Sequence, residues 1–159
     1  MKSILSNPQN GNNHLFICPD ERNSHQLAIQ IEQNYPDLEC DYIVPVYSNS
    51  LDELGIDISK KIGNRTFDYI WVGIGTPKQD FLAHQFSVSY YGSYILCIGA
   101  ALEFLAGTKK EAPIRIQNAG MEWLFRWSQE PRRLFKRYFI DSWGFISLML
   151  RENIELVGK

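Results

Sequence analysis

Residues 71–80, Trp-Val-Gly-Ile-Gly-Thr-Pro-Lys-Gln-Asp, have the residue types of an anion-binding turn. The apolar run at residues 69–72 predicts a strand that is buried on both faces. Gly73 and Gly75 follow directly, and glycine lets the backbone turn tightly or lets a ligand come close to it. A strand followed by such a turn indicates a binding site at the end of a strand in an open α/β sheet.

A helix is predicted to start directly after this turn. Thr76 is expected to cap it, and Pro77 suits the first helical position because its missing N–H is not needed there. Lys78 and Gln79 then fall beside the positive end of the helix, where N–H groups favour an anionic ligand. The alternative is that the glycines and the proline only shape a tight strand-to-helix turn.

A second set of chemically active residues is cationic. Residues 104–137 hold 8 basic and 3 acidic side chains, whereas residues 1–103 hold 6 basic and 12 acidic ones. Arg133 and Arg137 are one helical turn apart, so together they can present two guanidinium groups to a diphosphate. The alternative is a solvated helix face, but neighbouring aromatic residues favour an amphipathic helix at an anionic membrane surface.

Composition excludes several other classes of protein. The net charge of −2 and the absence of an RNA-binding motif argue against a nucleic-acid partner. Cys18, Cys40 and Cys97 are widely spaced, which favours free thiols in a reducing compartment. The three histidines are isolated, so no metal site is predicted. No signal peptide or spanning segment is predicted, and we expect a cytoplasmic protein.

Strand and helix signals alternate along residues 14–106. This pattern predicts an α/β fold with a Rossmann-like parallel sheet and helices on both faces, plus a C-terminal basic helical extension. Residues 1–13 are rich in asparagine and are expected to form a disordered leader. We expect an α/β ligand-binding domain over residues 14–130. Residues 131–159 are expected to form a basic, amphipathic helical segment.

Three blocks, in order, carry a family resemblance. Residues 72–80 (VGIGTPKQD) are similar to V-G-x-G-x-P-K-Q-E, and residues 98–107 (IGAALEFLAG) to G-x-x-F-D-F-x-A-G. The third block, Ala112-Pro113 with residues 120–126 and 130–138, is similar to A-P…G-L-E-W…R…E-P-x-R-x-x-R-Y. The chain from about residue 14 to about residue 138 therefore resembles the WecG/TagA/CpsF family of glycosyltransferases.

The resemblance implies an inverting transfer of N-acetylmannosamine, or a related sugar, from a UDP-sugar to a polyprenyl-diphosphate-linked sugar. It also implies action at the inner face of the cytoplasmic membrane, in surface polysaccharide synthesis, without a bound cofactor. On this basis the domain over residues 14–130 is expected to bind a UDP-sugar. The implied substrate-binding residues are Gly73, Gly75, Thr76, Pro77, Lys78, Gln79, Gly99, Ala100, Glu103, Arg126, Arg133 and Arg137.

The chain also departs from the family pattern. Members have a further N-terminal part that carries the aspartate proposed as general base, and we expect this chain to lack it. No catalytic residue is therefore assigned. Glu103 replaces the family's aspartate, and Glu111 stands where an arginine is usual. The alternative hypothesis is a catalytically incomplete nucleotide-sugar- or membrane-binding subunit, acting as a homo-oligomer or with a split-enzyme partner.

Overall fold

The computed structural model describes residues 1–7, 11–46, 48, 50–129 and 131. The chain divides into two compact units, Met1–Lys110 and Glu111–Lys159. The boundary predicted after residue 130 therefore lies 20 residues too late. The predicted basic extension at residues 131–159 lies almost entirely outside the described residues, so it stays a prediction.

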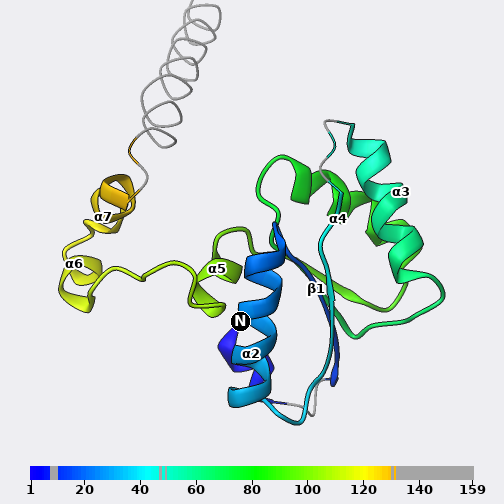
Figure 1. Ribbon diagram of the computed structural model, residues 1–159, viewed down its shortest axis with the longest axis horizontal. Helices are drawn as coiled ribbons and strands as arrows, with labels where there is room; N and C mark the ends of the chain where they lie inside the picture. The colour runs from blue at the N-terminus through cyan, green and yellow to red at the C-terminus, as the bar shows by residue number, and fades with distance from the viewer. Residues whose placement is uncertain (8–10, 47, 49, 130, 132–159) are drawn as a thin grey trace, which may run out of the picture. The chain divides into compact units, whose positions relative to one another are not determined.

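The first unit is built on a four-stranded parallel sheet in the order β2-β1-β3-β4 (Figure 1). The strands are β1 (Asn13–Ile17), β2 (Glu39–Ile43), β3 (Tyr69–Val72) and β4 (Tyr94–Cys97). The helices between and after them are α2 (Glu21–Asn34), α3 (Leu51–Ile62), α4 (Lys78–Ser89) and α5 (Ala101–Leu105). This alternation confirms the predicted α/β fold with a parallel sheet.

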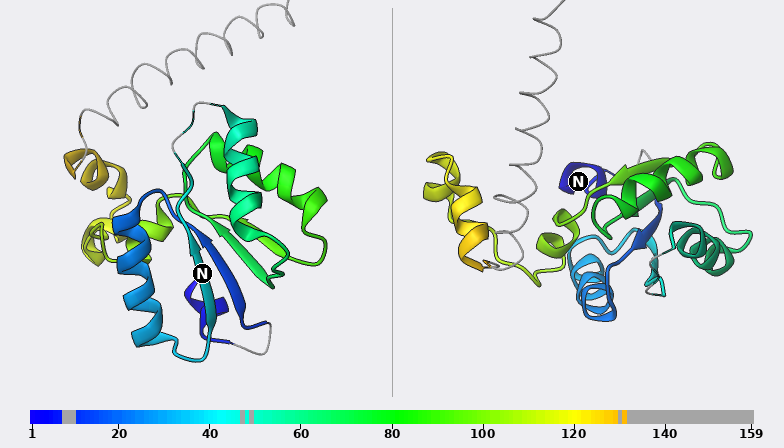
Figure 2. Two further views of the ribbon diagram at one scale, coloured as in Figure 1. Left: turned by 45° about the vertical axis from the view of Figure 1, so that its right-hand side comes forward. Right: turned by 90° about the horizontal axis from the view of Figure 1, so that it is seen from above.

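The two faces of the sheet are covered by different helices and carry different side chains. Side chains of α3 and α4 pack on an aliphatic face that includes Leu15, Ile17 and Ile70. Side chains of α2 and α5 pack on the opposite face, where Phe16 and Trp71 stack across neighbouring strands with ring centroids 5.9 Å apart. Figure 2 shows the sheet lying between these two layers. The alternation of faces along each strand is the period of two expected for β structure.

The start of the chain differs from the prediction of a disordered leader. Residues Lys2–Leu5 form a single helical turn, α1, and β1 already begins at Asn13. Leu5 is 2% exposed and belongs to the aromatic-face core. The prediction was wrong because it weighed the polar run at residues 6–13 and overlooked the apolar residues before it, whose burial favours order.

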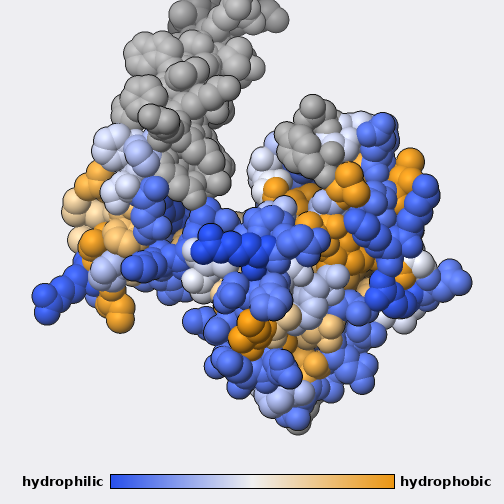
Figure 3. Space-filling view, in the orientation of Figure 1, coloured by the Kyte–Doolittle hydropathy of each residue, from blue (hydrophilic) through white to orange (hydrophobic). Residues whose placement is uncertain are grey.

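The second unit contains two short helices among the described residues, α6 (Ile114–Asn118) and α7 (Glu122–Gln129). Neither helix contains a buried residue, and Ile114, Met121 and Trp123 are exposed. Apolar residues on these helices are visible as orange surface in Figure 3. Within the described residues, none of the helices combines the length and apolar character needed to cross a bilayer.

Candidate functional site at the carboxyl end of the sheet

The strand order defines where a ligand site is expected in the first unit. After β1 the chain moves to one side to form β2, and after β3 it moves to the other side to form β4. The direction of winding therefore reverses between β1 and β3. In open α/β sheets, ligands bind outside the carboxyl ends of the strands at such a reversal. The predicted turn at residues 73–77 follows β3 directly, so it lies at this position.

Gly73 is required at the end of β3 by packing as well as by the turn. A Cβ atom built on Gly73 would lie 2.5 Å from Cδ1 of Leu102, which is fully buried in α5. Gly75 has a φ of +84° and no atom within 4 Å of the equivalent position. Gly73 therefore lets α5 approach the sheet, whereas Gly75 supplies a backbone conformation that other residues rarely adopt.

The start of α4 is capped differently from the prediction. The N-cap is Pro77, which makes no side-chain capping bond, and the Thr76 hydroxyl instead accepts a hydrogen bond from the Gln79 amide at 3.2 Å. The backbone N–H groups of Gln79 and Asp80 donate to the carbonyls of Gly75 and Pro77. The prediction of Thr76 as cap was wrong because the helix begins one residue later than expected. These two N–H groups are consequently already paired.

Gln79 has the most unusual environment in this turn. Its side chain is 9% exposed, and its Oε1 atom is buried without a hydrogen-bond partner among the described residues. A Cβ built on Gly99, in the turn after β4, would lie 3.4 Å from this oxygen. A buried amide oxygen without a partner costs free energy unless a ligand or water satisfies it. The Gln79 amide therefore has an unused acceptor beside Gly99, among the described residues.

The ammonium group of Lys78 has a hydrogen-bond partner within the chain. Its Nζ donates to the Ser48 carbonyl at 2.8 Å, so it ties the segment after β2 to the start of α4. In the structure this lysine therefore holds two loops together at the carboxyl end of the sheet. Its predicted contact with substrate stays a prediction.

The turn after β4 combines three predicted residues. Gly99 has a φ of +48°, and Ala100 caps α5 without a side-chain bond. Glu103, in the first turn of α5, pairs with Lys109 at 2.6 Å, and both side chains are 20% exposed. Glu103 therefore has an ion-pair partner within the chain, and its predicted contact with substrate stays a prediction.

A polar contact that the sequence analysis missed joins this turn to α2. Asn23 is 5% exposed, and its carbonyl oxygen accepts a hydrogen bond from the Thr108 hydroxyl. Its amide nitrogen donates to Asp20, the N-cap residue of α2, at 2.8 Å. A signal was present, because Asn23 precedes Leu27 and Ile31 at four-residue spacing. A polar residue on a buried helical stripe requires a hydrogen-bond partner.

The cationic candidates belong to the second unit. Arg126 lies in α7 and pairs with Glu122, one helical turn earlier, at 2.6 Å. Arg133 and Arg137 lie outside the described residues, so their predicted roles stay predictions. Among the described residues, no group of three His, Cys, Asp or Glu side chains is arranged to hold a metal ion.

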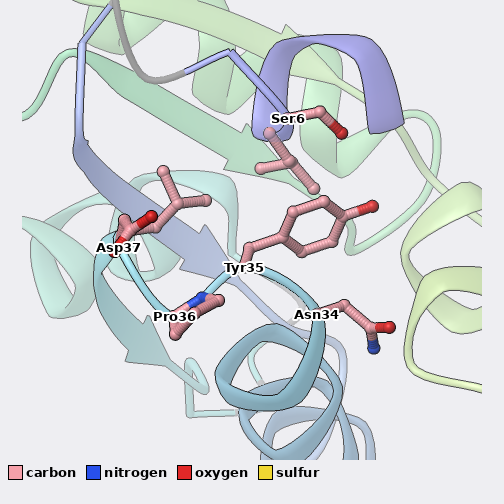
Figure 4. A pocket seen from close by; sticks show the side chains of 7 residues that line it. Ser6, Asn34, Tyr35, Pro36 and Asp37 are labelled. Atoms are coloured by element: carbon pink, nitrogen blue, oxygen red, sulfur yellow. The ribbon is translucent and has the colours of Figure 1, made fainter.

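Two surface cavities of the first unit lie away from the turns after β3 and β4. One of about 210 Å³ is enclosed by α1 and the turn after α2, with the ring of Tyr35 pointing toward Ser6 (Figure 4). Another, of about 520 Å³, is lined by residues that precede β1, β3 and β4, including Asp68 and Tyr91. Neither cavity is lined by a lysine or an arginine. Their linings therefore do not suit a diphosphate, whereas the carboxyl end of the sheet has cations nearby.

Comparison with known proteins agrees with the sequence resemblance. The sequence model of the glycosyl transferase WecG/TagA/CpsF family matches residues 1–158 of this chain. The chain belongs to this family. It is similar to two proteins named N-acetylglucosaminyldiphosphoundecaprenol N-acetyl-beta-D-mannosaminyltransferase. The one from Staphylococcus aureus MW2 is 28% identical over 109 residues, which is 69% of this chain and 41% of the relative. The one from strain NCTC 8325 is 30% identical over 101 residues, 64% of this chain and 37% of the relative.

Both glycine turns carry motifs of this family, but family membership does not establish the activity of the whole protein. The chain spans about 40% of the length of the curated relatives that it matches. The two glycine turns quoted for the resemblance, at residues 72–80 and 98–107, follow adjacent parallel strands. They therefore lie at the same end of the sheet, after neighbouring strands.

Proposed function

We propose that this chain is a glycosyltransferase component that binds a UDP-sugar at the carboxyl end of its sheet. The sugar is N-acetylmannosamine or a related one, and the acceptor is a polyprenyl-diphosphate-linked sugar, as in the names of the relatives. The transfer inverts the anomeric centre. One observation carries the proposal: the amide oxygen of Gln79, within a family motif, is buried without a hydrogen-bond partner among the described residues, and Gly99 of the next turn lies beside it.

The chemistry of sugar transfer assigns separate tasks to this site. The acceptor hydroxyl must lose a proton to a base, and the departing nucleotide diphosphate must have its negative charge stabilised. Gln79 Oε1 suits a donor group on the ligand, such as a sugar hydroxyl or a base N–H. Gly75, which has no atom within 4 Å of an added Cβ, lets the ligand approach the backbone closely. Neighbouring cations would stabilise the diphosphate.

The acceptor would be met by the basic part of the chain. Arg126, Arg133 and Arg137 are proposed to contact its diphosphate and the anionic inner face of the cytoplasmic membrane. Exchange of Arg133 and Arg137 for glutamate should weaken sedimentation with anionic liposomes, with the larger loss at low salt. Equal sedimentation of the variant and the parent chain at low salt would contradict this part of the proposal.

Calorimetry tests the donor site directly. The folded chain is titrated with UDP, with UDP-N-acetylmannosamine and, as a control for general nucleotide binding, with ADP. We expect saturable binding of the two uridine ligands and weaker binding of ADP. No heat of binding from a folded sample at millimolar ligand would refute the donor-site assignment.

A second function is favoured by the state of the acidic residues. Of the carboxylates near the candidate site, Asp20 caps α2 and Glu103 pairs with Lys109, whereas Asp80 lies in the first turn of α4. The alternative is therefore a nucleotide-sugar-binding subunit for which another polypeptide supplies the base. Robust transfer to a lipid-diphosphate acceptor by this chain alone would exclude the alternative, whereas binding without turnover would favour it.

A further inference from the structure

Lys109 is held beside the start of α5 by its own backbone as well as by its side chain. The N–H groups of Thr108 and Lys109 both donate to the Glu103 carbonyl, at 3.0 and 3.2 Å. Gly107, with a φ of +70°, provides the left-handed residue that lets the chain fold back after the helix. The Lys109 ammonium then meets the Glu103 carboxylate at 2.6 Å. The chain thus returns Lys109 to the first turn of α5, next to the turn that follows β4.

A second bond fixes the same segment from outside. Asn23 donates its amide N–H to the carboxylate of Asp20 and accepts the hydroxyl hydrogen of Thr108. A carboxylate can only accept, so the orientation of the Asn23 amide is determined by Asp20. The bond between Asn23 and Thr108 therefore ties the residue before Lys109 to the first turn of α2, which follows β1.

This arrangement is poorly explained as a contribution to stability alone. A partly buried ion pair gains little, because desolvation of both charges offsets their attraction. Here Glu103 and Lys109 are each 20% exposed, and three further hydrogen bonds hold the segment that carries the lysine. The result is a cation with a defined position at the end of the sheet where Gln79 leaves an acceptor unpaired. A fixed ammonium group at such a place suits a phosphate oxygen.

We propose that Lys109 is a diphosphate-binding residue of this site, positioned by Glu103 and by the Asn23–Thr108 hydrogen bond. The inference rests on the proposed function in that the diphosphate is the nucleotide's own. Glu103 then acts on Lys109 and not on a sugar hydroxyl. Glu103 holds the Lys109 ammonium group in place when no ligand is bound. When a diphosphate binds, it contacts the same ammonium group as Glu103.

Titration of the full chain with UDP, uridine and inorganic pyrophosphate tests the role of Lys109. Lys109→Met keeps the length of the side chain and removes its charge, and Lys60→Met is the matched control because Lys60 lies in the last turn of α3. We expect Lys109→Met to weaken UDP and pyrophosphate about tenfold or more, as for loss of a charged hydrogen bond, and to leave uridine within about twofold. Lys60→Met should leave all three affinities within about twofold.

The positioning step is tested at Thr108. Thr108→Val removes the hydroxyl at nearly constant shape, whereas Thr108→Ser keeps it. We expect Thr108→Val to weaken UDP several-fold with uridine unchanged, and Thr108→Ser to restore the parent affinity. Asn23→Ala should reproduce the effect of Thr108→Val. Ser93→Ala, which removes a hydrogen bond to the Phe67 carbonyl before β3, controls for a general loss of stability.

The outcomes separate the inference from the proposed function. Unchanged UDP and pyrophosphate affinity in Lys109→Met would overturn the inference and leave the function standing. An equal loss for uridine would also overturn it, because the defect would then be general. Parent chain that binds pyrophosphate through Lys109 without preferring UDP would support the inference and contradict the nucleotide assignment. Parent chain that binds none of the three ligands would overturn both.

Discussion

The amino and carboxyl ends of the sheet are both polar, but they use their polar groups differently. At the amino end, Asn13 donates to the Thr66 carbonyl at 2.7 Å, and Asp68 accepts the Asn13 N–H at 3.0 Å. Ser93 donates to the Phe67 carbonyl at 2.6 Å. These bonds join the starts of β1, β3 and β4. At the carboxyl end, by contrast, the buried oxygen of Gln79 has no hydrogen-bond partner in the part of the chain that the structure describes.

The proposed ligand site is therefore inferred from an unsatisfied polar atom and not from the size of a cavity. The amino end has the cavity of about 520 Å³, yet its polar groups hold the protein itself together. The carboxyl end has glycines that admit a neighbour and an acceptor that the protein leaves unused. Buried polar atoms are nearly always paired in folded proteins. Among the described residues, Gln79 Oε1, Gln85 Oε1 and Trp127 Nε1 have no partner, and of these Gln79 belongs to the motif turn after β3.

The largest expected effect concerns the packing of α5 on Gly73 at the carboxyl end. Leu102→Ala should lower the free energy of unfolding by about 2–5 kcal/mol, because it empties a fully buried site. Gly73→Ala should lower it by about 1–3 kcal/mol, because its Cβ would meet Leu102 at 2.5 Å. Denaturant unfolding of the single and double variants measures both costs.

The double variant decides whether packing is the cause. Leu102→Ala removes the contacts of the Gly73→Ala methyl group with Cδ1 and Cγ of Leu102, at 2.5 and 3.1 Å, and leaves the one with Cβ at 2.9 Å. The clash is therefore relieved in part, and the combined cost should be smaller than the sum of the two. Gly63, which lies before β3, has a φ of +63° and no atom within 4 Å of the added Cβ. Gly63→Ala should be destabilising through backbone conformation alone and additive with Leu102→Ala. Additivity at Gly73 as well would contradict the proposed packing role.

The next effect is a pH dependence at the amino end. His14 is fully buried, and its Nδ1 accepts a hydrogen bond from the Trp71 indole at 2.9 Å. Burial lowers the pKa of His14 below its ordinary value of 6.5. On acidification the unfolded chain therefore binds a proton before the folded protein does. The free energy of unfolding should be constant above about pH 6.5 and fall below it, by at most about 1.4 kcal/mol per pH unit.

Substitution separates His14 from other titrating groups. His14→Gln should remove this step from a plot of unfolding free energy against pH, measured by denaturant titration between pH 5 and 8. His84→Gln serves as the control, because His84 is exposed on α4. A step of equal size in His14→Gln would contradict the assignment. Binding of UDP should not follow this step while the chain remains folded, since His14 lies at the other end of β1.

The smallest expected effects on stability come from two substitutions that should differ in their effect on UDP affinity. Ser93→Ala breaks a bond at the amino end and should cost about 1 kcal/mol without a change in UDP affinity. Gln79→Met removes a buried unpaired oxygen at the carboxyl end and should leave the free energy of unfolding within about 1 kcal/mol. It should nevertheless weaken UDP binding about tenfold. A Gln79→Met variant that loses stability but retains its UDP affinity would contradict the proposed ligand-binding role of Gln79.

Much of the fold could be predicted from local patterns. The alternation of strand and helix signals is confirmed by four parallel strands with helices on both faces. The motif at residues 72–80 placed a glycine turn after a buried strand, and β3 ends at Val72 as that pattern required. These features depend on the period of apolar residues and on glycine, which act over a few residues and are therefore visible in the chain itself.

Features that depend on distant residues were predicted less well. Burial of Leu5 in the aromatic-face core ordered the start of the chain, contrary to the predicted leader. Thr76 was mistaken for a helix cap, since its hydroxyl accepts a bond from Gln79. The contact between Asn23 and Thr108 joins residues 85 positions apart. Neither the cap nor this contact can be derived from spacing, because each depends on which side chain the folded chain brings within reach.

The sequence by itself therefore determined the class of fold, the family and the residues from which a site can be built. The tertiary structure decided how those residues are used. It set Lys109 against Glu103, paired the first N–H groups of α4 internally, and left the Gln79 oxygen without a partner. The physical reason is that hydrogen-bond satisfaction is a property of three-dimensional neighbours, whereas hydrophobic period and turn chemistry are properties of the chain.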